Sequence, residues 1–258
     1  MKSLYIIIFY IFGTVFASFY NCLSYRLINK VSIIKPRSYC DNCKKTLKWY
    51  DMIPIVSYIV FRGQCRYCGK KIPVFYPISE LLCGVLFAVS FYSFGFSYDL
   101  IVALLISSLF IIVMYTDLNY YIIPDEINLV FAILIFITNI FRFGFLGSLK
   151  YLGFGAIMFL FMYALMFLGN FVFKEESLGG GDIKLLFGLG MIFPIITSFV
   201  GVTIAAILAL PLSVYLLIRH KDKVVPFGPF LVAGFLILFL LKINVSDIYN
   251  IVNSLFKF

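Results

Sequence analysis

Residues 179–186 read GGGDIKLL and place Asp182 between two apolar segments. Apolar sequence ends just before this glycine-rich turn and begins again just after it. A second acidic residue, Asp117, follows the apolar run at residues 100–115. A carboxylate at the rim of a lipid bilayer is costly to keep there and usually marks a functional site. Two such residues at the ends of membrane helices suggest paired carboxylates that perform acid–base chemistry beside lipid.

The composition indicates a membrane protein. The chain has 258 residues, of which 63% are hydrophobic and 13% are charged, whereas soluble domains average about 45–50% apolar and about 25% charged residues. We therefore predict an all-α polytopic membrane protein with about eight transmembrane helices. The expected helices cover approximately residues 4–23, 78–94, 100–115, 129–145, 151–173, 183–196, 198–218 and 230–241. The first is expected to be retained because no small-residue cleavage site follows it, and Pro194 is expected to bend or end a later helix.

Basic residues concentrate in one loop. Eleven of the 21 lysines and arginines lie between Arg26 and Lys71, where only Asp41 and Asp51 oppose them. Such positive charge holds a loop in the cytoplasm, suits contact with anionic lipid headgroups and, beside a membrane anchor, does not favour nucleic-acid binding. With this loop inside, sixteen basic residues are cytoplasmic and five are outside, and both candidate aspartates reach the cytoplasmic membrane edge.

The basic loop carries two Cys-x-x-Cys pairs. Cys40 and Cys43 form the first pair, and Cys65 and Cys68 form the second after an interval of 21 residues. Two such pairs complete a tetrahedral thiolate site for Zn2+, and a cytoplasmic location disfavours disulfides. Catalytic zinc sites commonly use histidine, and the single His220 lies in a separate charged turn, so we expect a structural metal. The chain is thus expected to have three parts: a first transmembrane helix at residues 1–24, a small cytoplasmic zinc-bound loop domain at 25–77 and a transmembrane core at 78–258.

The two acids are the best catalytic candidates. The chain has no HExxH metalloprotease motif, and a Ser-His-Asp triad would need His220, which is typical of a solvated loop. In an aspartic protease the ionised carboxylate takes a proton from water, and the protonated one hydrogen-bonds the peptide carbonyl. The alternatives are an ordinary helix N-cap for Asp182 and an interfacial helix-end acid for Asp117.

Five further residues are expected to support the pair. Absent side chains at Gly179 and Gly181 let the helix start and a substrate backbone approach the acid. Lys184 is expected to steady the charged form or to bind lipid headgroups. Asp125 opens a new helix after a proline, and Glu80, near the start of the second expected helix, is expected to line the site.

Taken in order, these motifs resemble the bacterial type IV prepilin peptidase family, the membrane aspartic proteases with a Gly-x-Gly-Asp motif. Residues 176–184 resemble the second active-site segment of that family, and Asp117 with residues 123–125 resembles the first. Further resemblances run along almost the whole chain, at residues 25–27, 38–40, 51–58, 62–69, 76–82 and 226–230. Where the family frequently reads GSFLNV, residues 17–22 read ASFYNC, with Ala17 and Cys22 at its ends, and the chain holds no glycine-rich Rossmann fingerprint.

The resemblance implies a specific activity. Members cut the short basic leader from type IV prepilins and pseudopilins at the cytoplasmic face of the bacterial plasma membrane, and Asp117 and Asp182 carry over as the catalytic pair. Many members then methylate the new amino terminus with S-adenosylmethionine, an activity attributed to the amino-terminal cytoplasmic region. We further hypothesise that acidic residues bind the basic leader, namely Asp125, Glu126, Glu175 and Glu176.

Two other functional hypotheses stay open from the residues alone. In the first, the protein is a membrane transporter or assembly scaffold with a zinc-stapled loop, and the acids bind a proton or a cation. In the second, it is a methyltransferase without protease function. Loss of proteolysis on replacement of Asp182 by asparagine would separate a protease from both.

Overall fold

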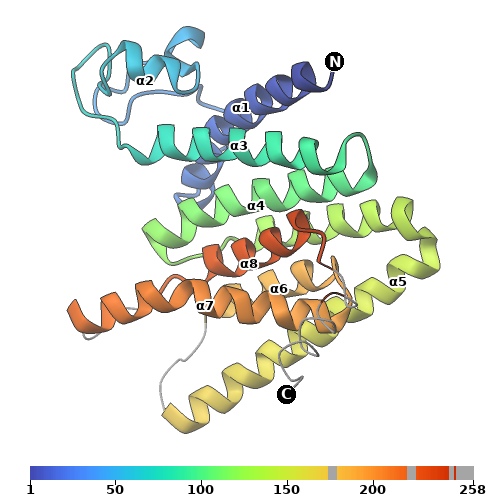
Figure 1. Ribbon diagram of the computed structural model, residues 1–258. Coiled ribbons are helices and arrows are strands. Elements are labelled where there is room, and N and C mark those ends of the chain that lie inside the picture. Colours follow the sequence, from blue (N-terminus) through green and yellow to red (C-terminus); the bar gives the residue numbers. More distant parts are fainter. Residues whose placement is uncertain (174–178, 220–224, 244–246, 248–258) are drawn as a thin grey trace. The chain divides into compact units, whose positions relative to one another are not determined.

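The computed structural model describes residues 1–173, 179–219, 225–243 and 247. Regular structure in these residues is helical, and their only β pairing consists of two isolated bridges (Figure 1). The prediction of an all-helical protein is therefore confirmed. The chain divides into an amino-terminal unit, Met1–Phe96, and a carboxy-terminal unit, Ser97–Phe258, while the three parts expected from the sequence stay a prediction.

Two glycines bring the long helices of the amino-terminal unit together. The helices of this unit are α1 (Lys2–Ile28), η1 (Trp49–Met52), α2 (Val56–Val60) and α3 (Phe75–Phe94). A Cβ atom on Gly13 of α1 would lie 2.6 Å from the carbonyl oxygen of Cys83 and 2.8 Å from the Cα of Gly84 in α3. Small residues at such a crossing let helix backbones approach closely within a membrane.

The carboxy-terminal unit is a bundle of apolar helices. Its described helices are α4 (Tyr98–Tyr120), α5 (Asp125–Phe173), α6 (Gly180–Gly190), α7 (Ile195–Arg219) and α8 (Gly228–Leu240). Helix α6 packs against α5, and α8 packs against both α4 and α7. Helix α5 is kinked at Gly144, whose φ of +73° is open to glycine but strained for other residues. The kink falls where the sequence predicts a boundary between two helices.

Five described helices are long and apolar enough to cross a membrane: α1, α3, α4, α5 and residues 195–216 of α7. Helices α6 and α8 have 11 and 13 residues, fewer than the roughly 20 that a straight span needs. The number of about eight transmembrane helices therefore stays a prediction. The helix expected at residues 183–196 ends earlier, at Gly190, and Pro194 lies between α6 and α7 as the sequence predicted.

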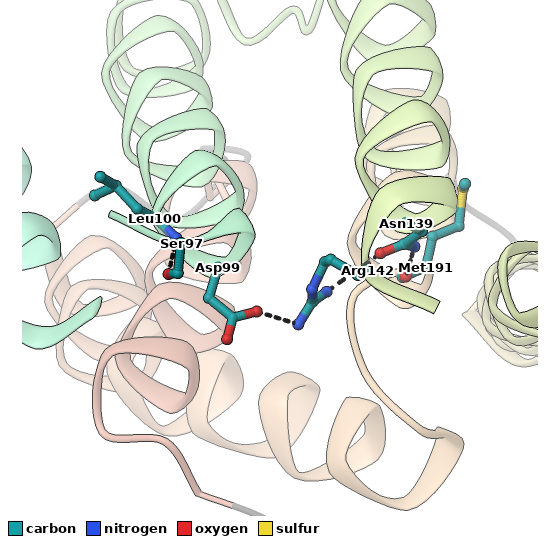
Figure 2. Close-up of polar contacts among 6 residues, drawn as sticks. All are labelled: Ser97, Asp99, Leu100, Asn139, Arg142 and Met191. Atoms are coloured by element: carbon teal, nitrogen blue, oxygen red, sulfur yellow. Dashed lines mark hydrogen bonds and ion pairs between the residues drawn. The ribbon is translucent and has the colours of Figure 1, made fainter. Parts of the chain in front are cut away.

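Polar contacts tie three helices of the carboxy-terminal unit together, as Figure 2 shows. The Nη2 atom of Arg142 lies 2.7 Å from Oδ1 of Asp99, in the first turn of α4. The Nη1 atom of Arg142 donates to Oδ1 of Asn139 at 3.2 Å, and Nδ2 of Asn139 donates to the carbonyl of Met191 at 2.8 Å, just past α6. These contacts join α4, α5 and α6 at the helix ends opposite those that carry the candidate acids.

Candidate active site

Asp117 lies in the last turn of α4 and is held by the start of α8. Its side chain is buried, with 7% of the residue exposed. Its Oδ2 atom accepts a hydrogen bond from the backbone N–H of Gly228 at 3.0 Å. Helix α4 then ends at Tyr121, whose φ of +56° turns the chain and whose N–H bonds back to the Asp117 carbonyl. The carboxylate therefore points at the amino terminus of α8, where free N–H groups favour negative charge.

Asp182 lies inside the first turn of α6, so the N-cap alternative for this residue is wrong. The N-cap is Gly179, and no side chain caps this helix. Asp182 is 8% exposed, and its Oδ1 atom is buried with no hydrogen-bond partner among the described residues. Because a buried polar atom without a partner is expensive, this oxygen is a candidate for contact with a bound molecule.

Ile123 lies against the starts of α6, which carries Asp182, and of α8, which contacts Asp117. A Cβ atom on Gly181 would lie 3.1 Å from Cβ of Ile123, and one on Gly228 would lie 2.8 Å from its Cδ1. Because Gly181 and Gly228 lack side chains, α6 and α8 can both pack closely against Ile123.

The other glycines of the turn are under less steric restraint. A Cβ atom on Gly179 would lie 3.4 Å from Oδ2 of Asp182, an ordinary van der Waals contact, and one on Gly180 would meet nothing within 4 Å. At Gly181, a side chain would crowd Ile123, so the absence of one permits the close approach of the helix start. At Gly179, a side chain would only touch Asp182.

Lys184 pairs with Asp125 and not with the candidate acids. Its Nζ atom lies 2.8 and 2.7 Å from the two carboxylate oxygens of Asp125, in the first turn of α5. Both side chains are exposed, so the pair contributes little to stability. The pair links α5 and α6 near their amino-terminal ends.

Sequence reasoning did not single out Gly228, Ile123 or Asn128 as site residues. Asn128, one turn into α5, is 7% exposed, and neither atom of its amide has a hydrogen-bond partner among the described residues. An asparagine at the start of an apolar helix was a readable signal of a polar site. The contacts of Gly228 and Ile123 join distant segments, so no local signal marks them.

The four loop cysteines come together in the amino-terminal unit. Their Sγ atoms all lie within 4.8 Å of one another, and those of Cys40 and Cys68 are 3.8 Å apart. Four sulfurs around a zinc ion at about 2.3 Å would be separated by roughly 3.8 Å along each tetrahedral edge. The donor set therefore fits Zn2+.

Both cysteine pairs lie in turns of the same construction. In the first turn, the N–H of Cys40 donates to the Lys45 carbonyl and the N–H of Lys44 donates to the Cys40 carbonyl; Cys65 and Gly69 repeat this pattern in the second. The residue after each second cysteine has a positive φ, +56° at Lys44 and +71° at Gly69. Gly69, whose positive φ is open to glycine without strain, therefore closes the second turn.

Glu80 belongs to the amino-terminal unit, on α3. Its Oε2 atom accepts the backbone N–H of Ile55 at 2.8 Å, and the side chain lines a cavity within that unit. Its expected place beside the two aspartates stays a prediction. Of the acids expected to bind a leader, Asp125 and Glu126 are exposed at the start of α5, and Glu175 and Glu176 lie outside the described residues.

Comparisons with known proteins cover nearly the whole chain. Residues 11–94 match the bacterial peptidase A24 N-terminal domain, and residues 103–214 match the type IV leader peptidase family. A prepilin leader peptidase/N-methyltransferase of Bacillus subtilis (strain 168) is 33% identical over 252 residues, which are 94% of this chain and 96% of the relative.

Two other relatives carry the same description. The protein of Myxococcus xanthus (strain DK1622) is 35% identical over 72% of this chain and 56% of its own length, and that of Legionella pneumophila is 32% identical over 81% and 74%. No solved structure matches the chain. Because both halves match one family architecture and a relative of equal extent is 33% identical, this protein belongs to the type IV leader peptidase family.

Proposed function

We propose that this protein cleaves the leader peptide of prepilins and pseudopilins with Asp117 and Asp182, at the cytoplasmic face of the bacterial plasma membrane, and then N-methylates the new amino terminus. Its family consists of leader peptidases, and its relatives are described as peptidases that are also N-methyltransferases. The observation that carries the assignment of the pair is two carboxylates, each more than nine-tenths buried, beside helix starts that both pack on Ile123. One oxygen of Asp182 has no hydrogen-bond partner among the described residues.

The hydrogen bonding assigns different roles to the two acids. Asp117 accepts the N–H of Gly228, and a donated hydrogen bond favours the ionised form of a carboxylate. Asp182 lacks such a donor at Oδ1, so the proton shared by the pair is placed on Asp182. Asp117 then removes a proton from the attacking water, while Asp182 donates a hydrogen bond to the scissile carbonyl. The proton taken up by Asp117 passes to the leaving amine as the peptide bond breaks.

The start of α5 is proposed to contact the basic leader. Asp125 already has its charge compensated by Lys184, whereas Glu126 is exposed beside it. Replacement of Glu126 by lysine is therefore expected to raise the KM for prepilin more than the same change at Asp125. Equal effects at the two positions would remove this distinction.

Two cofactors accompany the proposal. Zn2+ held by the cysteines Cys40, Cys43, Cys65 and Cys68 would be structural, because four protein ligands fill a tetrahedral site. S-adenosylmethionine supplies an electrophilic methyl group on a sulfonium sulfur when bound. The new amino terminus would accept this methyl group with loss of one proton from its nitrogen.

The test is prepilin cleavage in membranes that contain the intact protein, Asp117→Asn or Asp182→Asn at equal protein levels. Mass spectrometry of the product reads the new amino terminus and, for methylation, the added mass of one methyl group in place of hydrogen. Cleavage is expected only with the intact protein. Cleavage that persists in either variant would contradict the assignment of the pair.

A further inference from the structure

The loop between α1 and α3 exposes apolar side chains outside the membrane-spanning helices. Neither η1 nor α2, the two short helices of this loop, has a buried residue. Trp49 in η1 is 71% exposed, and Ile59 and Val60 in α2 are 68% and 64% exposed. Large apolar patches on the water-facing part of a protein commonly mark contact with another protein or with a membrane. Residues 49–61 are called the apolar segment below.

The exposed residues of α2 lie on one side of the helix. Val56, Ile59 and Val60 follow the i, i+3, i+4 spacing that brings side chains to one helix face, and all three are exposed. Ser57 and Tyr58 lie on the other side, are less exposed and line the cavity of the amino-terminal unit. The apolar face of α2 therefore points away from the interior of the loop.

The apolar segment is too short to cross a bilayer but is attached to one at both ends. It has 13 residues, whereas a straight span needs about 20, and Ile55, with φ +61°, turns the chain between η1 and α2. The loop that contains it joins α1 and α3, two helices that are long and apolar enough to span a membrane. An apolar segment in this position is suited to lie in the plane of the interface.

The single acid of the apolar segment is turned inward. The side chain of Asp51 is 5% exposed. Its Oδ2 atom accepts hydrogen bonds from the Tyr67 hydroxyl at 3.1 Å and from the Lys48 N–H at 3.0 Å. The outer surface of the segment therefore presents no carboxylate that anionic lipid would repel.

Basic residues flank the apolar segment on both sides. Residues 49–61 contain no lysine or arginine, whereas residues 44–48 and 62–71 contain seven and no acid: Lys44, Lys45, Lys48, Arg62, Arg66, Lys70 and Lys71. All seven are exposed. In the described part of the chain, only Arg66 lies within 4.0 Å of a carboxylate. This charge attracts anionic headgroups, and it would repel a second copy of the same loop.

We propose that the apolar segment docks on an anionic bilayer, in the leaflet at which α1 ends and α3 begins. Trp49, Ile59 and Val60 enter the boundary between headgroups and acyl chains, where tryptophan is enriched, and the flanking lysines and arginines contact lipid phosphates. The loop that carries the four cysteines is thereby held against the membrane surface. This inference does not depend on the proposed cleavage.

The first test is the fluorescence of Trp49, the single tryptophan of the chain, in full-length protein with one copy per lipid nanodisc. Lipids brominated near the carbonyl end of the acyl chain are expected to quench its emission more strongly than lipids brominated near the terminal methyl. The reason is that interfacial segments lie only about 5–10 Å into the boundary. Emission that neither lipid quenches overturns the proposal, because Trp49 then faces water or protein.

The second test varies the charge of the lipid. Quenching is expected to be stronger in discs that contain phosphatidylglycerol than in discs of phosphatidylcholine alone, and added salt is expected to reduce this difference because it screens exposed charges. Equal quenching in the two kinds of disc overturns the proposal of an anionic surface.

A matched pair of variants tests the apolar face itself. Ile59→Glu places a negative charge on this face and is expected to lower the quenching of Trp49, whereas Ile59→Leu is expected to retain it. Because Ile59 is 68% exposed, neither change removes a side chain from a core. Wild-type quenching in Ile59→Glu overturns the proposal.

Discussion

Replacement of Gly228 by alanine is expected to impair cleavage without unfolding the protein. The added Cβ atom would lie 2.8 Å from Cδ1 of Ile123, 2.9 Å from Cγ1 of Val113 and 3.0 Å from Oδ2 of Asp117. Overpacking of this kind typically costs about 1–3 kcal/mol, and a hydrogen bond to a charged group contributes about 1.5–3 kcal/mol. If about half of that hydrogen bond is lost in the transition state, kcat falls roughly tenfold, and complete loss approaches a hundredfold.

The assay is steady-state cleavage of a prepilin by purified protein in nanodiscs, with kcat and KM measured separately. The expected change is in kcat, because the substituted atom lies against the catalytic carboxylate and leaves the leader-binding surface intact. Gly180→Ala is the matched control, since its Cβ would meet nothing within 4 Å, and wild-type kcat is expected. A Gly228→Ala protein with wild-type kcat would refute the role given to this backbone N–H.

Three further predictions concern the loop turns, the metal and the helix contacts. Lys44→Gly is expected to stabilise the loop by up to about 1 kcal/mol and Gly69→Ala to destabilise it by about 1–2 kcal/mol, because only glycine adopts a positive φ without strain. Both changes are measured by thermal denaturation, with zinc release as the signal. Equal shifts of the unfolding temperature in the two variants would contradict this reasoning. Elemental analysis of the intact protein is expected to give one zinc ion per chain; Cys65→Ser is expected to abolish this zinc binding, and Cys22→Ser is the control expected to retain it. Asn139→Ala is expected to lower stability by about 1–3 kcal/mol, measured as Tm in detergent, because it removes the donor to the Met191 carbonyl and one acceptor of Arg142; an unchanged Tm would show that the two hydrogen bonds of Asn139 in Figure 2 contribute nothing.

The helical elements were largely predictable because hydropathy and proline mark them locally. Gly144 can adopt the positive φ of the break in α5, and Pro194, which cannot sit inside a helix without cost, lies between α6 and α7. The clustering of four cysteines was likewise predictable, since each Cys-x-x-Cys pair already brings two ligands to one turn.

The surroundings of the two acids were not predictable from local pattern. Charge alone suggests that Lys184 serves the nearest acid, Asp182, yet its ammonium binds Asp125, 59 residues away. The role of Gly228 depends on an aspartate in another helix, and that of Ile123 depends on two glycines that approach it from different helices. Such contacts are set by tertiary packing, which sequence periodicity does not specify.

The hydrogen bond between Asp117 and Gly228 can form only late in the synthesis of the chain. The two residues are 111 positions apart in the chain, and both aspartates leave the ribosome before α8 does. A nascent chain that already contains the whole carboxylate pair therefore still lacks the amide that fixes one member. Proteolytic competence would then begin only after the last described helix has been inserted, so that a partly made enzyme is harmless to the membrane proteins around it.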